Sequence, residues 1–374
     1  KVYSSSLSLE KHVTQLKLLK LFYLWGGTPN LIISDYFIEK ELLYQLKKEH
    51  FDLIHISGRN LITPAIKIGK KLNIPTLVHI RDYWPICPIR TLITYYQGTC
   101  FSHTNKCLTC QINNYKERKG LFKLFVSLWS KIALIQTIKR WDSLKKADGY
   151  ILISKFLVEL FEKKGLTKEK MHLLYNPIIK QKKIDITKLN NKKFIILFVG
   201  RLSEEKGIED ILTLAKNLKD DSNIIIKIIG TGPLAEKIKK INLSNINLLG
   251  KLPNKETLIE MQKANLLLVT STWPEPFGRI AIEGFQSKIP VLSYNTGGLS
   301  ELIPHSFFRV KVNNIAELIQ KIKIIQNNIP LQKKEINLQL KGIDKFKLKT
   351  IIIKLEGIYK KMENNKNDKF KKTH

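Results

Sequence analysis

The sequence has 374 residues, of which 64 are Lys or Arg and 32 are Asp or Glu, so its formal net charge at pH 7 is +32. Its length predicts two domains, and its hydrophobic fraction of 43% is ordinary for a globular protein with a sizeable core. It contains no run of about 18 uncharged apolar residues, so no transmembrane helix is expected. The basic excess invites a nucleic-acid interpretation. Because it is spread evenly along the chain, we favour a general compositional bias, which would also attract the chain to anionic membranes.

Residues 1–50 lack an initiator Met and the basic-then-apolar pattern of a signal peptide, so we expect a fragment or a processed product. A strand-like start precedes a predicted amphipathic helix over about residues 9–24, a turn containing Gly26 and Gly27, and a second helix over 37–50. No strand leads into the two glycines and no helix start follows them closely. A plain turn is therefore favoured over a phosphate loop.

From residue 51 the pattern alternates between strands and helices. The predicted elements are, in chain order, a strand (51–57), a helix (60–71), a strand (74–80), a strand (149–154), a helix ending near 164 and an extended stretch (170–178). The irregular stretch 82–111 is rich in Cys, Pro and Tyr, and the polar residues 179–193 form a natural linker. We therefore predict an N-terminal domain over residues 1–178.

The second half alternates more regularly. Its six predicted strands are 194–200, 223–230, 246–250, 265–271, 290–294 and 307–310. Helices are expected to start near Gly207, Pro233, Lys255, Gly278, Gly298 and Asn314. Short buried strands separated by helices predict an α/β domain over 194–345, with a parallel sheet covered on both faces. A final helix over 348–362 and a disordered basic tail complete the predicted segment 346–374.

Ligands of such sheets bind beyond the carboxyl ends of the strands, where residues 270–285 are expected to lie. This stretch carries two carboxylates, Glu275 and Glu283, eight positions apart. On one helix they would be roughly 12 Å apart, which is too far for the acid/base pair of a glycosidase. Between them, a helix start near Gly278 would favour a phosphate. The arrangement suits an extended ligand with sugar, diphosphate and ribose parts.

Five motifs of the second half occur in a family-like order. They are "VGRLSEEKG" (199–207), "IIGTGP" (228–233), "LLGKLPNKE" (248–256), "PEPFGRIAIEG" (274–284) and "NTGGLSELI" (295–303). With these motifs the chain resembles the retaining glycosyltransferases of the GT-B fold, family 4 type (glycosyl transferases group 1). In the first half, "IPTLVHIRDYWPICP" and "YILISKFLVELF" are similar to the acceptor domain of that family. The resemblance covers about residues 40–360 and implies two Rossmann-like domains facing across a cleft.

The resemblance also implies roles for individual residues. Arg201 and Lys206 would bind the donor diphosphate in place of a catalytic metal, because the leaving group develops negative charge. Glu283 would hold the ribose hydroxyls, and Glu275, with the backbone at Phe277 and Gly278, would hold the sugar and phosphate. The glycines would let the backbone approach the nucleotide. The implied donor-binding set is Gly200, Arg201, Lys206, Gly230, Gly232, Phe277, Gly278, Glu283, Thr296 and Gly297.

The chain departs from the family pattern in the first half. The strand and Gly-rich loop that usually open the acceptor domain do not appear, so we expect that domain to lack its first βαβ unit. Aligned on "DYWP", the family's catalytic His position holds Arg81, and His79 lies two residues earlier on the same strand face. Either side chain would act near the leaving phosphate or the acceptor, and a His79 satisfied within the core is the alternative.

All four cysteines fall within one short stretch, at Cys87, Cys100, Cys107 and Cys110. Their clustering favours a reducing compartment and a structural zinc site over a disulfide framework spread through the fold. The closing C-x2-C matches a zinc knuckle, whereas the first gap is irregular. Disulfides or free thiols remain the alternatives.

Residues 116–146 carry nine Lys or Arg and two Asp or Glu, with apolar Leu121, Phe125 and Trp129 at helical spacing. The pattern fits an amphipathic helix packed on the core, or an interfacial helix that binds anionic lipid. We favour the helix packed on the core. Members of the family often act on lipid-linked acceptors, so the resemblance adds support to the second interpretation, which stays open.

We therefore expect a metal-independent, retaining glycosyltransferase of glycolipid, cell-surface polysaccharide or glycan synthesis. Its donor would be a UDP-, GDP- or ADP-sugar, its acceptor a lipid-linked molecule or a glycan, and its location the cytoplasm or the inner face of the cell membrane. No specific nucleic-acid partner is expected. The alternatives are a basic nucleic-acid-binding protein with a zinc knuckle, which would leave the donor motifs unexplained, and a related GT-B epimerase or phosphorylase, which would lack the "PEPFG…EG" pattern.

Overall fold

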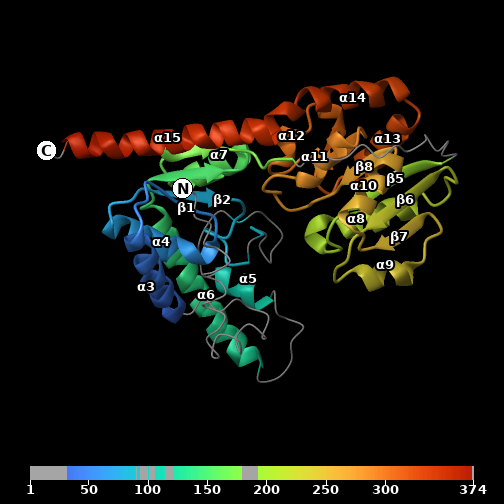
Figure 1. Cartoon of the computed structure of the whole chain (residues 1–374). Helices are drawn as coiled ribbons and strands as arrows, with labels where there is room; N and C mark the ends of the chain where they lie inside the picture. The colour runs from blue at the N-terminus through green and yellow to red at the C-terminus, as the bar shows by residue number, and fades with distance from the viewer. Residues whose placement is uncertain are drawn as a thin grey trace. The chain divides into compact units, whose positions relative to one another are not determined.

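The computed structural model describes residues 32–89, 91, 92, 100, 106–113, 122–178 and 193–372. The chain divides into two compact units (Figure 1). Unit 1 comprises Lys1–Leu152, Phe161–Leu173 and Leu355–His374, and unit 2 comprises Ile153–Leu160 and Leu174–Lys354. The elements predicted before residue 32 and most of the predicted linker lie outside the described residues.

Over its described residues, unit 1 is built on a parallel sheet of four strands in the order β1-β2-β3-β4. The strands are β1 (Ile54–Ile56), β2 (Thr76–Ile80), β3 (Gly149–Leu152) and β4 (Met171–Leu173). The α-helices with residues in this unit are α3 (Ile32–Lys48), α4 (Ile62–Lys71), α5 (Lys106–Asn113), α6 (Phe122–Leu144), α7 (Lys155–Lys163) and α15 (Leu348–Lys372). Residues such as Leu77, Ile80 and Ile151 are fully buried, as the near-continuous apolar strands of a parallel sheet require.

Unit 2 contains a parallel sheet of six strands in the order β10-β9-β8-β5-β6-β7. Its strands are β5 (Phe194–Val199), β6 (Ile224–Ile229), β7 (Ile246–Gly250), β8 (Leu266–Val269), β9 (Val291–Tyr294) and β10 (Arg309–Val310). The central strand β5 pairs with β6 on one side and β8 on the other, so the strand order reverses between β5 and β8. Such a reversal places the loops after both strands at one crevice, where ligands of doubly wound sheets bind.

The helices of unit 2 begin close to the residues that the sequence marks as helix starts. Those that lie wholly within unit 2 are α8 (Ile208–Asn217), α9 (Ala235–Ile241), α10 (Asn254–Lys263), α11 (Arg279–Gln286), α12 (Leu299–Leu302), α13 (Ile315–Gln326) and α14 (Ile329–Lys341). Gly207, Gly278, Gly298 and Asn314 are the residues directly before α8, α11, α12 and α13. The predicted architecture of two α/β parallel-sheet domains is confirmed.

Three helices differ from the sequence analysis. Helix α14 was not expected, and α5 lies within the stretch interpreted as irregular. Helix α15 continues to Lys372, where the sequence analysis expects a disordered tail from residue 363. No Pro or Gly occurs between Gly357 and Lys372 to end the helix, which accounts for its length. Within the described residues, we find no helix long and apolar enough to span a bilayer.

Candidate functional site

The loops after β5 and β8 are joined at the carboxyl edge of the unit 2 sheet. The Thr270 hydroxyl donates to the Lys206 carbonyl at 3.0 Å, and the Thr272 amide donates to the Glu205 carbonyl at 3.1 Å. The 3₁₀ helix η3 (Glu204–Lys206), between β5 and α8, is thereby held beside the Thr270–Gly278 loop. Two motifs that are about 70 residues apart in the chain therefore form one surface.

At this surface, Lys206 and Glu275 form a bidentate ion pair. The Lys206 Nζ lies 3.0 Å from Glu275 Oε1 and 2.8 Å from Oε2, and the two side chains are only 23% and 16% exposed. The indole Nε1 of Trp273 donates to Glu275 Oε2 at 2.6 Å, and Nζ lies 5.0 Å from the centre of the Trp273 ring. The structure thus brings together two residues predicted for the site and adds Trp273, which the sequence analysis did not single out.

Arg201 follows β5 and is exposed. Among the described residues it has no side-chain hydrogen bond or ion pair. A guanidinium without an internal partner can bind a phosphate through two parallel hydrogen bonds. Arg201 and Lys206 lie on the same short loop, so the loop presents two cations.

Helix α11 begins beside this loop. Its capping residue Gly278 has a φ of +96° and a ψ of 49°, and the first amide groups of the helix have no partner within it. Phe277 is buried, so the turn is fixed by packing. Glu275 lies before the helix, not on it, so the separation of Glu275 and Glu283 is not set by the rise of one helix. The positive end of α11 lies between them in the chain.

Glu283 lies on α11, and its side chain is 25% exposed. Its only ion pair among the described residues is a long contact of 3.5 Å between Oε1 and Arg279 Nη2. Burial raises the pKa of the Glu283 carboxyl, and the Arg279 charge opposes this shift. A partly buried carboxylate with spare acceptor capacity is suited to bind hydroxyl groups.

The loop after β9 packs on the same surface. The Gly298 amide donates to the Glu275 carbonyl at 2.6 Å, and the Thr296 hydroxyl donates to the Trp273 carbonyl at 3.3 Å. Gly297 has a φ of +53°, and a Cβ there would collide with the Glu275 backbone. Gly297 therefore adjoins the Glu275 backbone, and Thr296 adjoins that of Trp273.

The glycines after β6 serve close packing of two loops. A Cβ on Gly230, whose φ is +144°, would collide with the Gly200 carbonyl, and one on Gly232 would collide with the Leu202 carbonyl. The Leu202 amide also donates to the Thr231 carbonyl at 2.9 Å. The packing of these loops is therefore enough to require glycine at positions 230 and 232. Contact of Gly230 and Gly232 with a nucleotide remains a prediction.

Glu301 is a further residue that the sequence analysis missed. Its carboxylate accepts hydrogen bonds from the Lys155 amide at 2.8 Å and from the Tyr175 hydroxyl at 3.1 Å. The Tyr175 ring stacks on Phe277 with a centroid distance of 5.9 Å. Glu301 and Tyr175 thus support the turn that precedes α11, which no local sequence pattern reveals.

In unit 1, His79 lies on β2 and stacks on His55 of β1, with ring centroids 5.5 Å apart. His55 Nδ1 lies 2.6 Å from the Tyr359 hydroxyl, and neither Nε2 atom has a hydrogen-bond partner among the described residues. Burial, then the His55 and Arg81 charges, lower the pKa of His79 to about 3. His79 is therefore neutral at pH 7. The sequence analysis did not single out His55. Its position in the strand next to that of His79 was the signal that could have identified the pair.

Arg81 follows β2 and is exposed, and its Nη2 donates to the Ser57 carbonyl at 3.0 Å. It therefore lies at the carboxyl edge of the unit 1 sheet, just after β1 and β2 end. The adjacent Asp82 accepts the Trp84 amide at 2.9 Å and so fixes the turn that follows.

The four cysteines do not form a ligand set in the structure. Cys87 and Cys107 are buried, and Cys100 and Cys110 are partly exposed. Among the described residues, no three His, Cys, Asp or Glu side chains are placed to hold a metal ion. Lys164 lies within electrostatic reach of Cys87, Cys100 and Cys107. The residues as placed do not fit the predicted zinc, and we assign no chemistry to a metal here.

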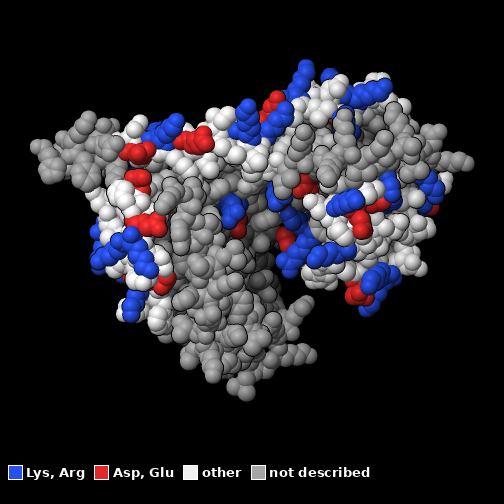
Figure 2. Space-filling view, in the orientation of Figure 1, with Lys and Arg blue, Asp and Glu red and all other residues white. Residues whose placement is uncertain are grey.

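The predicted lipid-binding stretch 116–146 is only partly described. Its apolar residues Leu121, Phe125 and Trp129 lie outside the residues whose side chains are described. Over the rest of α6, Thr137, Arg140 and Leu144 are buried, whereas Ile135 and Ile138 are 61% and 42% exposed. On the face shown in Figure 2, basic and acidic side chains are interspersed over both units.

Comparison with known proteins covers most of the chain. Residues 8–182 match the family model "Glycosyltransferase Family 4", and residues 179–338 match "Glycosyl transferases group 1". An uncharacterized 42.6 kDa protein in the cps region of Klebsiella pneumoniae is 26% identical over 282 residues, which cover 73% of this chain and 66% of that protein. An uncharacterized glycosyltransferase of Methanocaldococcus jannaschii is 36% identical over 143 residues, which cover 37% and 39%. The chain thus spans less than two thirds of the length of these relatives.

The solved structures show the same fold. The Anabaena protein HepE in complex with UDP-glucose superposes with a TM-score of 0.60 at 18% sequence identity, over 87% of this chain and 82% of that one. At such low identity the likeness concerns the fold alone.

Proposed function

Because this chain belongs to the group 1 glycosyltransferases with the GT-B fold, we propose that it transfers a sugar from a nucleotide-diphospho-sugar to an acceptor hydroxyl with retention of the anomeric configuration. The carrying observation is the surface of unit 2 on which Arg201, the Lys206–Glu275 pair and the first turn of α11 occur together. It combines cations for a diphosphate with carboxylates for hydroxyl groups.

In this proposal Arg201 and Lys206 bind the donor diphosphate, together with the amides at the start of α11. Departure of the nucleoside diphosphate leaves negative charge on its phosphate oxygens, and positioned cations lower the energy of that transition state. The two cations allow the reaction to proceed without a catalytic metal. Gly200, Gly230 and Gly232 lie beside the same loops.

The carboxylates orient the two sugars of the donor. Glu283 accepts hydrogen bonds from the ribose hydroxyls, and Glu275 accepts them from the transferred sugar. Glu275 is already held by Lys206 and Trp273, so its geometry is set before the donor binds. Such preorganisation lowers the cost of ordering the site during catalysis.

On the acceptor side we propose a role for Arg81 and for neutral His79. With a pKa of about 3, His79 is a weak base at neutral pH. It therefore acts as a hydrogen-bonding group, while the leaving phosphate accepts the acceptor proton. Arg81 supplies positive charge near the leaving phosphate or the acceptor.

We further propose UDP as the nucleotide and a cell-surface polysaccharide or glycolipid as the product. The Anabaena protein of the same fold binds UDP-glucose, and the Klebsiella relative is a protein of a cps region. A lipid-linked acceptor would bring the enzyme to the inner face of the cell membrane. The exposed Ile135 and Ile138, beside Lys131 and Lys139 on α6, suit such an interfacial position.

A donor panel tests the proposal. Thermal shift and donor hydrolysis are measured with UDP-, GDP- and ADP-sugars, with and without EDTA. We expect UDP-sugars to stabilise the protein, EDTA to leave turnover unchanged, and Glu283→Ala to remove the stabilisation. No stabilisation by any donor, together with no effect of Glu283→Ala, would refute the site. Salt-sensitive RNA binding without hydrolysis would favour the nucleic-acid alternative.

A further inference from the structure

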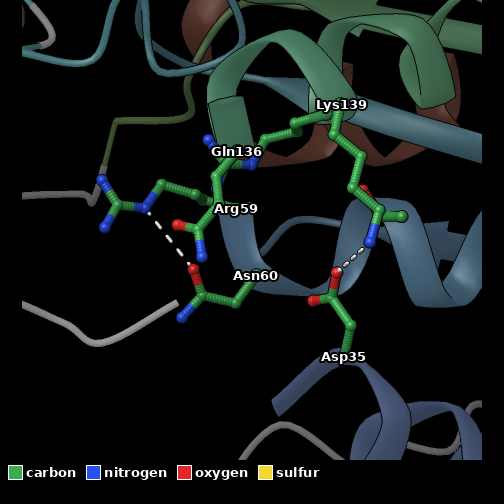
Figure 3. Close-up of a pocket in the computed structure, with 7 residues that line it drawn as sticks. Asp35, Arg59, Asn60, Gln136 and Lys139 are labelled. Atoms are coloured by element: carbon green, nitrogen blue, oxygen red, sulfur yellow. Dashed lines mark hydrogen bonds and ion pairs between the residues drawn. The ribbon is translucent and has the colours of Figure 1, made fainter. Parts of the chain in front are cut away.

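Unit 1 contains a polar pocket whose lining includes none of the residues proposed above for the donor or the acceptor. It is formed by the start of α3, the 3₁₀ helix η1 (Arg59–Leu61), the start of α4 and the last turns of α6. Figure 3 shows Asp35, Arg59, Asn60, Gln136 and Lys139 around it. The cavity volume is about 20 Å³. This exceeds the roughly 10–15 Å³ that one water needs, so the pocket accepts one small polar group.

Arg140 also lines this pocket and is the reason to regard it as a site. Arg140 is 7% exposed. Within the described part of the chain, its guanidinium nevertheless has no hydrogen bond or ion pair. The pKa of Arg140 is lowered to about 10, first by burial and then by the nearby Arg59 charge, whereas the Asp35 charge opposes this shift. A buried charge normally has a partner, because removing it from water otherwise costs several kcal/mol.

Most of the charged residues that line the pocket are cationic. Three of the lining residues, Arg59, Lys139 and Arg140, are cationic, whereas Asp35 is the single lining carboxylate. Asp35 Oδ2 lies 3.3 Å from Lys139 Nζ, so its charge is already shared. The charges of Arg59 and Arg140 repel one another, and an anion between them would reduce the repulsion.

The side chains that line the pocket are of the kinds that bind oxyanions. A guanidinium presents a planar fork that binds phosphate or carboxylate through two parallel hydrogen bonds. The amides of Asn60 and Gln136 add neutral donors at the same pocket. A nucleotide would not fit in the cavity, whereas a phosphate group at its mouth could place one oxygen inside.

We propose that this pocket binds one phosphate group, held by Arg140 and Arg59 with Lys139 at its rim. The phosphate is either free in solution or the headgroup of a lipid, and the chemistry of recognition is the same for both. The proposal concerns unit 1 and does not depend on the donor site of unit 2.

Binding of inorganic phosphate to the full chain tests the proposal. The titration is done by calorimetry at constant ionic strength, with chloride as the balancing anion, in an Arg201→Gln background that weakens phosphate binding at the proposed donor site. A hydrogen bond to a charged group contributes about 1.5–3 kcal/mol, so Arg140→Gln and Arg59→Gln are each expected to weaken binding by about 10- to 100-fold. Lys131→Gln, which removes an exposed charge from the same helix, should change it less than about twofold.

Asp35→Asn provides a test in the opposite direction. It removes the carboxylate that competes with the ligand, so phosphate should bind more tightly, by about three- to tenfold. If circular dichroism shows that Arg140→Gln does not fold, the Arg59→Gln and Asp35→Asn variants decide. Absence of saturable phosphate binding, or equal weakening by Lys131→Gln, would overturn the proposal, because diffuse basicity would then explain the response.

Vesicles distinguish the two sources of phosphate. Phosphatidic acid presents a terminal phosphate, whereas phosphatidylglycerol carries a similar charge without one. Selective binding to phosphatidic acid vesicles that is lost in Arg59→Gln identifies a lipid headgroup as the ligand. Phosphate binding without this selectivity identifies a free phosphate or a soluble phosphorylated molecule.

Discussion

Replacement of Lys206 by Met tests two effects of this residue separately, one on the free energy of unfolding and one on the proposed reaction. Met keeps the length and apolar character of the side chain but removes the charge that contacts both oxygens of Glu275. The carboxylate, 16% exposed, would then retain the Trp273 indole as its remaining hydrogen-bond donor among the contacts described above. Removing one partner of a buried pair costs about 3–5 kcal/mol, and the partial exposure of this pair reduces our expectation to about 2–3 kcal/mol.

The effect on activity has a different origin. Lys206 is proposed to stabilise charge on the leaving diphosphate, and loss of one such group lowers kcat by about 10²–10³. We expect Lys206→Met to reduce turnover of the sugar nucleotide by this factor even at temperatures where it is fully folded. Lys206→Arg, which keeps the charge, is the matched control and should retain more activity than the Met variant.

A double-mutant cycle tests the reasoning. Lys206→Met with Glu275→Gln leaves no unpaired charge, so part of the lost stability should return while the activity stays low. Unfolding is followed by urea denaturation and turnover by release of the nucleotide. If Lys206→Met changes the free energy of unfolding by less than about 0.5 kcal/mol, and the cycle shows a coupling below that value, the ion pair is not a feature of the protein in solution.

Three further predictions concern other parts of the chain. Burial raises the pKa of the Glu335 carboxyl to about 7, so the folded state favours its protonated form and loses stability as the pH rises from about 4.5 to 7. Above pH 7, Glu335→Gln should therefore be more stable than the parent chain by roughly 3 kcal/mol. Below pH 4.5 it should not be more stable, and urea titrations at both pH values measure the difference. Gly230→Ala should destabilise unit 2 by more than about 2 kcal/mol because its Cβ meets the Gly200 carbonyl, whereas Gly250→Ala, with open space around it and a φ of +70°, should cost only about 1 kcal/mol. His79 should show no imidazole titration in NMR spectra between pH 5 and 8, and an inflection in that range would contradict its burial.

The sheets could be predicted from sequence because each strand is a short apolar run between turn residues. Helix starts in unit 2 were predictable for a related reason: Gly207, Gly278 and Asn314 mark the chain positions where a helix begins. Helix α14 has a weaker amphipathic pattern, and its buried Glu335 and Gln339 read as surface residues. A pattern that counts apolar residues cannot detect a helix that buries polar ones.

The residues of the proposed donor site could be selected from the sequence, but their arrangement could not. Motif order identified Lys206, Glu275 and Glu283, whereas the direct pairing of Lys206 with Glu275 depends on loops that are distant in the chain. Trp273, Glu301 and His55 were missed for the same reason, since each acts through a partner that only the fold brings near. The cysteines show the reverse case, because their close spacing in sequence corresponds to no metal-ligand set among the residues that the structure describes.

Trp273 is the single tryptophan in the sequence of unit 2, and its indole donates to the carboxylate at the centre of the proposed donor site. Its fluorescence therefore reports on the electric field and solvation of that carboxylate. A chain in which the other four tryptophans are replaced by Phe would carry one local optical probe. Stopped-flow emission from this chain would separate the rate of donor arrival from the rate of sugar transfer, without a label and without a coupled assay.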